Sequence, residues 1–207
     1  GGGAGAEPPA PPRPLLRIAA QPRFIAAATS GMMAYGAMAF LMSASPLAIV
    51  ACGLPHTEAH WVIFMHVMGM FVPAFFTGNL ITRFGTTPVM FAGVALLVFG
   101  VAAGLLGMSE WNFRIALTLN GVGWNFLFVG ATTLVTTCYR PNERGKVQAF
   151  NDFLVFGTTA TASFMAGFMQ DRLGWYPLNW FAIALMAIAF AAVTWLAFQR
   201  RPVNATA

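Results

Sequence analysis

The sequence predicts an all-α integral membrane protein with six transmembrane helices arranged as a 3+3 inverted repeat. The first observation is the scarcity of charge: 8% of the residues are charged and 58% are hydrophobic, whereas a soluble domain carries about 25% charged residues. The second is a series of six long intervals between ionised side chains, each close to or above the roughly 20 apolar residues that a helix needs to cross a bilayer. The third is that these intervals are continuously apolar, which favours helices over the alternating pattern of barrel strands.

The predicted elements follow one another with short connections. Residues 1–22 are expected to form a flexible cytoplasmic linker, because residues 1–14 are rich in Gly, Ala and Pro and fit a protein that continues upstream. Pro22 suits the first turn of the helix that follows. Residues 23–200 form the predicted six-helix bundle, and residues 201–207 a cytoplasmic tail. The six spans lie near residues 24–47, 59–81, 88–108, 115–138, 148–169 and 178–198.

The polarity of the spans repeats every three helices. The third span contains no polar side chain, and the sixth contains only Asn179 and Thr194. The first, second, fourth and fifth carry Ser, Thr, Asn, His or Asp side chains, which are costly in lipid unless they face partners or water. These four helices are therefore expected to line an interior. Three is an odd number of crossings, so the second triplet is inverted relative to the first, as in many secondary transporters.

The basic residues predict the orientation in the membrane. If the spans alternate, nine of the eleven basic residues fall at one end, which by the positive-inside rule places both termini in the cytoplasm. The formal charge of +5 is thus an orientation signal, and no nucleic-acid partner is expected. Cys52 and Cys138 fall at opposite ends of spans, too far apart for a disulfide. The nine basic residues at the predicted cytoplasmic end are Arg13, Arg17, Arg23, Arg83, Arg140, Arg144, Lys146, Arg200 and Arg201.

The segment GNLITRFGTT, residues 78–87, lies in the predicted turn between the second and third spans. Arg83 could bond the free carbonyls at the end of the second helix or act only as a cytoplasmic anchor. The segment resembles the signature loop of the major facilitator superfamily, G-x-L-x-D-R-x-G-R, in which Gly78, Leu80, Arg83 and Gly85 match. Thr82 and Thr86 stand where the family has its Asp and its second Arg, so the loop lacks the carboxylate of the family's charge-based gating lock.

The resemblance extends over nearly the whole chain beyond the linker. HVMGMFVPAFFTGNLITRFG and YRPNERGKVQAFNDFLVFG look like parts of the eighth, tenth and eleventh helices of a bacterial subfamily. It implies the C-terminal half of a twelve-helix secondary transporter in the bacterial inner (plasma) membrane, working by alternating access on a small-molecule substrate. The expected partners are the lipid bilayer and an N-terminal six-helix half. The sequence holds no Walker-type phosphate loop, so an ion gradient is the expected energy source, and no cofactor is expected.

Helical spacing selects residues for the expected substrate cavity. Tyr35, Met38 and Met42 share one face of the first span, and each can equally be packing. Four-residue spacing likewise places His66 and Met70 on one face of the second span, and Asn120 and Trp124 on one face of the fourth. His66 and Asp152 are the candidates for ion coupling, since both are ionisable and fall within spans; a neutral hydrogen-bonded histidine and a helix cap or a partner for Arg144 are the alternatives. The remaining cavity candidates are His66, Met70, Asn120, Trp124 and Asn125, with Phe128 on the same face as Trp124.

Two other classes of protein stay open at this point. His56 and His60 lie four residues apart with His66 nearby, which would suit a membrane metal-binding protein or enzyme. A few methionines beside His66 would suit a copper site, since thioethers and imidazole bind Cu(I); they are Met38, Met42, Met65 and Met70. Three histidines are too few for a di-iron centre, and no serine has a placed base, so neither an enzyme nor a metal site is expected.

Overall fold

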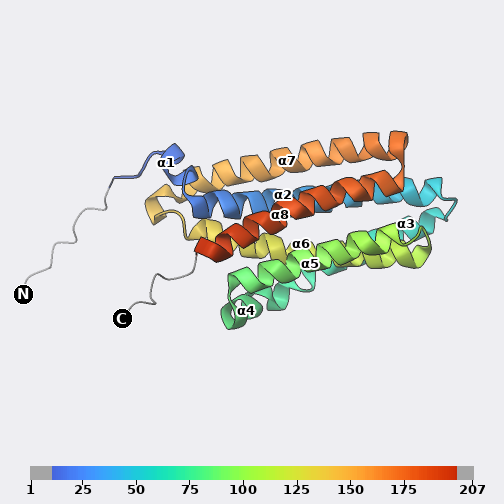
Figure 1. The fold of residues 1–207 in the computed structure, drawn as a ribbon, viewed down its shortest axis with the longest axis horizontal. Coiled ribbons are helices and arrows are strands. Elements are labelled where there is room, and N and C mark those ends of the chain that lie inside the picture. Colours follow the sequence, from blue (N-terminus) through green and yellow to red (C-terminus); the bar gives the residue numbers. More distant parts are fainter. Residues whose placement is uncertain (1–10, 200–207) are drawn as a thin grey trace, which may run out of the picture.

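The computed structural model describes residues 11–199, and every regular element in that range is a helix (Figure 1). The predicted linker therefore lies partly, and the predicted tail 201–207 wholly, outside the described residues. Within residues 11–22 of the predicted linker, a short helix buries Ile18 against the bundle. The elements are α1 (Leu15–Ala19), α2 (Pro22–Ala51), α3 (His56–Phe71), α4 (Ala74–Phe84), α5 (Thr86–Leu105), α6 (Glu110–Thr136), the 3₁₀ turn η1 (Pro141–Glu143), α7 (Arg144–Leu173) and α8 (Trp175–Gln199).

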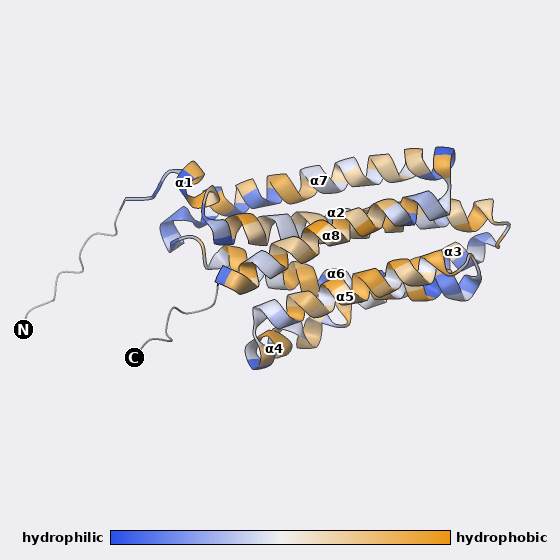
Figure 2. Cartoon of the chain, viewed as in Figure 1, coloured by the Kyte–Doolittle hydropathy of each residue, from blue (hydrophilic) through white to orange (hydrophobic). Residues whose placement is uncertain are grey.

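Four helices, α2, α5, α6 and α8, are long and apolar enough to cross a membrane, and α3 with α4 adds a fifth crossing if the bent pair is one span. Helix α7 has 30 residues but is not in this group. Its threonines and other polar side chains give it the pale and blue stretches seen in Figure 2. The crossing by α7, and with it the count of six spans, stays a prediction.

The packing of the helices has an internal two-fold pattern. Helices α2 and α6 pack against each other at the centre. The second and third helices of each triplet pack on the first helix of the other triplet: α3 and α5 on α6, and α7 and α8 on α2. This exchange is what an inverted repeat of three helices produces, with α2 matching α6, α3 and α4 matching α7, and α5 matching α8.

The predicted second span is broken in the middle. Helix α3 ends at Phe71, α4 begins at Ala74, and the two axes differ by 41°. Pro73 stands at the break, where it has no N–H to donate to the preceding turn and its ring crowds that turn. A single helix over 59–81 was expected, and the structure corrects this to two helices.

The connections place the elements at two ends of the bundle (Figure 1). The turn between α4 and α5 is Gly85 alone, whose φ of 89° lies in the region that favours glycine. That turn, the start of α2 and the connection from α6 to α7 share one end, called here the basic end because Arg23, Arg83 and Arg140 lie there. The connections that follow α2, α5 and α7 lie at the opposite end.

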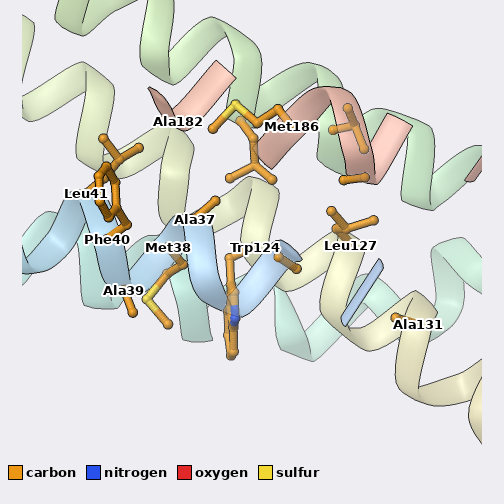
Figure 3. Packing of buried hydrophobic residues seen from close by; sticks show 14 of the residues in the cluster. Ala37, Met38, Ala39, Phe40, Leu41, Trp124, Leu127, Ala131, Ala182 and Met186 are labelled. Carbon is orange, nitrogen blue, oxygen red and sulfur yellow. The ribbon is translucent and has the colours of Figure 1, made fainter. Parts of the chain in front are cut away.

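Close approach of backbones fixes the centre of the bundle. A Cβ on Gly93 of α5 would lie 2.7 Å from the backbone nitrogen of Leu127 and 2.9 Å from the carbonyl oxygen of Gly123, both on α6. Gly93 therefore permits the close packing of α5 on α6. Figure 3 shows side chains of α2, including Phe40 and Leu41, packed with Trp124 and Leu127 of α6 and Met186 of α8.

Candidate substrate-binding surface

A hollow of about 330 Å³ opens between α2, α3 and α7. It brings together four of the predicted cavity residues, Tyr35, Met38, Met42 and Met70. Helices α5 and α8 do not contribute to its lining, which agrees with the scarcity of polar side chains along their middle turns. The other residues of the lining are Ala39, Ser43, Val67, Phe71 and Ser163.

An aromatic cluster extends from Tyr35, which lines the hollow. The ring of Tyr35 meets three rings edge-on, those of Trp124 at 5.3 Å, Phe128 at 5.1 Å and Phe156 at 5.7 Å between centroids. Trp124 and Phe128 are stacked, with centroids 5.2 Å apart and planes 13° from parallel. The indole nitrogen of Trp124 is buried and donates to no residue in the described part of the chain. The cluster therefore presents flat apolar ring faces, and its one unused hydrogen-bond donor is buried.

Four residues of α7 lie in a row on the face of the helix that borders the hollow. Asp152, Phe156, Thr159 and Ser163 follow the spacing of an α-helix and fall within about 60° around its axis. Phe156 touches Tyr35 and Ser163 lines the hollow, so Asp152 stands on the face that borders it. Its carboxylate is exposed and makes no ion pair within residues 11–199, so the expected contact with Arg144 is absent. Phe156 was not predicted, although its spacing from Asp152 was the available signal.

His66 does not line the hollow. Its side chain is fully buried where α3 packs on α6, and Nδ1 lies 2.8 Å from the carbonyl oxygen of Leu117. Because a carbonyl only accepts, Nδ1 carries the proton. Nε2 has no partner among the described residues. This geometry suits a histidine that ties two helices together.

The two asparagines also bind helices to one another. Asn125 donates from Nδ2 to the carbonyl oxygen of Met70 (2.8 Å) and accepts from the hydroxyl of Thr77 (2.6 Å). Met70 precedes the break at Pro73 and Thr77 follows it, so Asn125 joins the two arms of the bent span. Asn120 donates more weakly to the carbonyl oxygen of Met38, at 3.3 Å.

The histidines proposed for a metal site are not brought together. His56 and His60 are exposed on the first turns of α3, whereas His66 is buried. Within residues 11–199, no three His, Cys, Asp or Glu side chains are grouped so as to hold a metal ion. Of the methionines considered for copper, Met38, Met42 and Met70 line the hollow without His66.

Comparison with known proteins decides the family. The family model described as the Major Facilitator Superfamily matches residues 27–207. The chain belongs to the major facilitator superfamily. This superfamily is one of membrane transporters, as expected from the sequence.

Its relatives in this superfamily are bacterial transporters. The chain is 46% identical over 168 residues to the riboflavin transporter RfnT of Brucella anthropi. The matched region is 81% of this chain and 42% of RfnT. The chain is 32% identical over 132 residues to the uncharacterized MFS-type transporter YddS of Bacillus subtilis, covering 63% of this chain and 30% of that protein. The drug efflux pump JefA of Mycobacterium tuberculosis is 29% identical over 117 residues, covering 56% of this chain and 23% of the pump. The chain thus spans less than half the length of these relatives.

The superfamily loop residues lie at the end of α4. Gly78, Leu80 and Arg83 belong to the helix, and Gly85 makes the turn into α5. The guanidinium of Arg83 lies over the ring of Phe84, 5.2 Å from its centroid. No carbonyl among the described residues accepts from Arg83, so the expected cap on the second helix is not formed. Arg83 is exposed and available to a partner.

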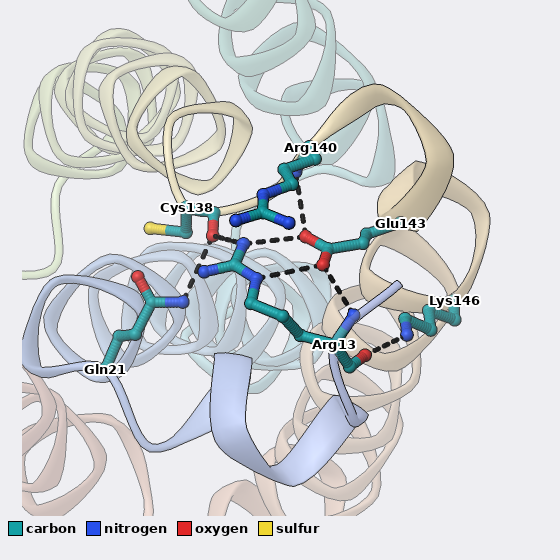
Figure 4. Close-up of polar contacts among 6 residues, drawn as sticks. All are labelled: Arg13, Gln21, Cys138, Arg140, Glu143 and Lys146. Carbon is teal, nitrogen blue, oxygen red and sulfur yellow. Dashed lines mark hydrogen bonds and ion pairs between the residues drawn. The ribbon is translucent and has the colours of Figure 1, made fainter. Parts of the chain in front are cut away.

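A second polar cluster at the basic end was not predicted (Figure 4). The carboxylate of Glu143, fully buried, accepts from three nitrogens of Arg13 at 2.6–2.9 Å and from the backbone N–H of Arg140 at 2.9 Å. The ammonium of Lys146 donates to the carbonyl oxygen of Arg13. The hydrogen bond from the Arg13 guanidinium, with the backbone donors, holds the pKa of Glu143 far below its ordinary value. We call this set the Arg13–Glu143 latch, because it fastens the segment before α1 to the turn between α6 and α7.

Proposed function

We propose that this chain is the C-terminal six-helix half of a secondary transporter of the bacterial inner membrane, with both termini in the cytoplasm. The proposal is supported by the family, by the inverted packing of the two triplets and by the gathering of nine basic residues at one predicted end. An N-terminal half, facing the hollow between α2, α3 and α7, would complete a central site. Rocking of the two halves would expose that site alternately to each side of the membrane.

The proposed substrate is riboflavin or a similar planar aromatic molecule. The relative RfnT is a riboflavin transporter, and the observation that carries the proposal in this chain is the aromatic cluster of Tyr35, Trp124, Phe128 and Phe156. Offset-stacked and edge-to-face arrangements are the favoured contacts of aromatic rings, so this cluster suits a flat fused ring. Phe156 is 55% exposed, which leaves a ring face for the substrate.

Transport of labelled riboflavin into proteoliposomes, using the full-length transporter that contains this chain, tests the substrate. Aromatic pairs contribute about 0.5–1.5 kcal/mol, so Tyr35→Leu and Phe156→Leu should each raise KM by about two- to tenfold. Phe164→Leu is the matched control, since Phe164 is 76% exposed on the same helix but outside the cluster. Wild-type vesicles without riboflavin uptake, or equal effects of all three substitutions, would refute the proposal.

Asp152 is the proposed coupling residue. It is the one ionisable side chain on the face of α7 that borders the hollow within the described range, and it has no ion-pair partner there. A carboxylate at that depth can take up and release a proton as the two halves move. Asp152→Asn should leave riboflavin exchange across the vesicle membrane intact while abolishing accumulation driven by a proton gradient. Glu110→Asn, at the other end of the bundle, should change neither, and accumulation by Asp152→Asn at the wild-type level would exclude this role.

A further inference from the structure

A second hollow, larger than the first, lies on the other side of α7. Its volume is about 430 Å³, and it runs between α2, α7 and α8. Almost all of its lining is apolar, and Thr158 and Thr161 bond their hydroxyls to carbonyls of their own helix. We call it the furrow. Its lining is Met32, Met33, Gly36, Phe40, Phe153, Leu154, Gly157, Thr158, Thr161, Ala162, Met165, Phe181 and Leu185.

The furrow does not belong to the proposed substrate site. On α7, Phe156 and Ser163 face the first hollow, whereas Gly157, Thr161 and Met165 line the furrow, about 150° away around the helix axis. One wall of the furrow is α8, which contributes nothing to the first hollow. The two spaces are therefore separated by the body of α7 and by its contact with α2.

The depth of the furrow corresponds to the interior of the bilayer. Gly36 and Gly157 lie close to the midpoints of α2 (Pro22–Ala51) and α7 (Arg144–Leu173). Met32 follows the start of α2 by ten residues, about 15 Å along the helix and about half the thickness of a hydrocarbon core. Water in such a place would find few polar partners, so the occupant must be apolar.

A pocket that includes two glutamines and an arginine lies at the basic end, between α2 and α8. It is formed by Gln21, Pro22 and Arg23 at the start of α2 and by Trp195 and Gln199 at the end of α8. Arg23 is exposed and makes no ion pair or hydrogen bond with another residue in the range 11–199. Tryptophan is the side chain that prefers the level of lipid headgroups.

Residues of the pocket and of the furrow lie along one face of α8. Phe181 and Leu185 line the furrow and Trp195 and Gln199 line the pocket, and all four fall within about 80° around the helix axis. A single elongated molecule lying along this face would place one end against Arg23 and the other in the furrow. At the opposite end, the two arginines of the described range both have carboxylate neighbours, since Arg172 lies 3.6 Å from Asp171 and Arg114 pairs with Glu58.

We infer that this groove is a binding site for an anionic phospholipid of the leaflet at the basic end. The phosphate would bind Arg23, with Trp195 and Gln199 beside the headgroup, and one acyl chain would lie in the furrow at mid-membrane. Charge complementarity selects the anionic headgroup, and the apolar lining at hydrocarbon depth selects the chain. The lipid would fill the space between α7 and the α2–α8 pair, and so support α7 from the side opposite the substrate hollow.

Glycine substitutions on α7 test the acyl-chain part. Gly157 lines the furrow and Gly167 does not, and a Cβ at either position meets nothing within 4 Å, so the backbone tolerates a larger side chain at both. The full-length transporter would be purified in mild detergent, incubated with phosphatidylglycerol and analysed by native mass spectrometry. Gly157→Leu should lower the bound lipid about tenfold, equivalent to about 1.4 kcal/mol, and Gly167→Leu should retain it. Equal occupancy in the two variants would overturn the proposal.

Arginine substitutions test the headgroup part. The wild-type protein should retain phosphatidylglycerol in preference to phosphatidylcholine, Arg23→Gln should lose this preference, and Arg172→Gln should keep it. Binding of the two lipids to the same extent by the wild-type protein would overturn the assignment of an anionic lipid. A change in riboflavin KM in Gly157→Leu with unchanged lipid retention would show that the furrow serves substrate or the N-terminal half instead. The lipid-retention readouts do not depend on which substrate is transported.

Discussion

Asn125 is the residue on which the shape of the bent span depends most directly. It is buried on α6, and its two hydrogen bonds reach Met70 before the break and Thr77 after it. At Pro73 the helix loses a donor, so carbonyls near the break need a partner from elsewhere. Asn125 supplies that donor to Met70, which makes the bend a joint property of α3, α4 and α6.

Replacement of Asn125 by Leu should destabilise the transporter by about 1 kcal/mol, because hydrogen bonds between membrane helices contribute about 0.6 kcal/mol on average and up to about 1.7 kcal/mol. The midpoint of thermal unfolding in detergent measures the effect. Asn120→Leu is the control. Its donor is 3.3 Å from Met38 and its buried Oδ1 has no partner in the described chain, so its loss should be close to neutral. A larger shift for Asn120→Leu than for Asn125→Leu would contradict this account.

The sequence located candidate residues better than it located their roles. Tyr35, Met38, Met42 and Met70 share one hollow because helical spacing alone puts residues on a face. A polar side chain in an apolar helix indicates only that a partner is needed. For His66 the partner is a backbone carbonyl of a neighbouring helix, and for Asn125 the partners are a backbone carbonyl and the hydroxyl of Thr77. No local pattern in the sequence distinguishes such partners from a substrate.

At the scale of helices, α5 and α6 are held at a distance that only glycine permits. The contact at Gly93 is with backbone atoms of α6, the nitrogen of Leu127 and the carbonyl oxygen of Gly123, which cannot move aside as a side chain could. Trp175 of α8 adds a hydrogen bond from its indole nitrogen to the carbonyl oxygen of Gly104, at 2.9 Å. The third helix of each triplet is thereby fixed on the side away from the hollow.

Gly93→Ala should therefore destabilise the bundle by about 1–3 kcal/mol, the usual cost of overpacking a close contact. Gly157→Ala is the matched control, since it is also within a long helix and a Cβ there meets nothing within 4 Å. It should be neutral or slightly stabilising because alanine favours a helix over glycine. Thermal unfolding of both variants in the same detergent gives the comparison, and equal midpoints would show that α5 can shift to accept the methyl group.

The helices themselves could be predicted to within a few residues, because charge-free length is a property of the sequence. The span expected at 88–108 is α5, Thr86–Leu105, and the one expected at 178–198 is α8, Trp175–Gln199. The break in the second span could not be predicted from the sequence, because the degree to which a proline bends a membrane helix depends on the neighbouring helices. The partner that accommodates this break is on α6, 48 residues beyond Thr77.

At the scale of the whole molecule, the Arg13–Glu143 latch ties the approach to α2 to the far side of the bundle. The two residues are 130 positions apart, and no pattern in the sequence relates them. If an N-terminal half precedes Arg13, its connection to this half is fastened at the turn between α6 and α7.

The latch predicts a pH dependence of stability. The pKa of Glu143 is lowered by folding, so its contribution is fully present above the ordinary carboxyl value of 4.5 and is lost as the pH falls from there through the folded-state value. The unfolding midpoint of Glu143→Gln should lie below that of the wild type at pH 7, and the difference should shrink below pH 4.5. Glu110→Gln, at the opposite end, provides the control. A difference that stays constant from pH 7 to pH 3 would exclude the latch as its cause.

The two natural cysteines offer a test of the orientation of the whole bundle. Cys52 is exposed at the end of α2 away from the basic end, whereas Cys138 is buried. With the basic end in the cytoplasm, a membrane-impermeant maleimide added to intact cells should label Cys52 in a transporter with no other exposed cysteine. In a Cys52→Ser, Thr82→Cys variant, labelling should require permeabilised cells, because Thr82 is exposed at the basic end near Arg83. Labelling of position 82 from outside would invert the topology, and the lipid inferred at Arg23 would then belong to the outer leaflet.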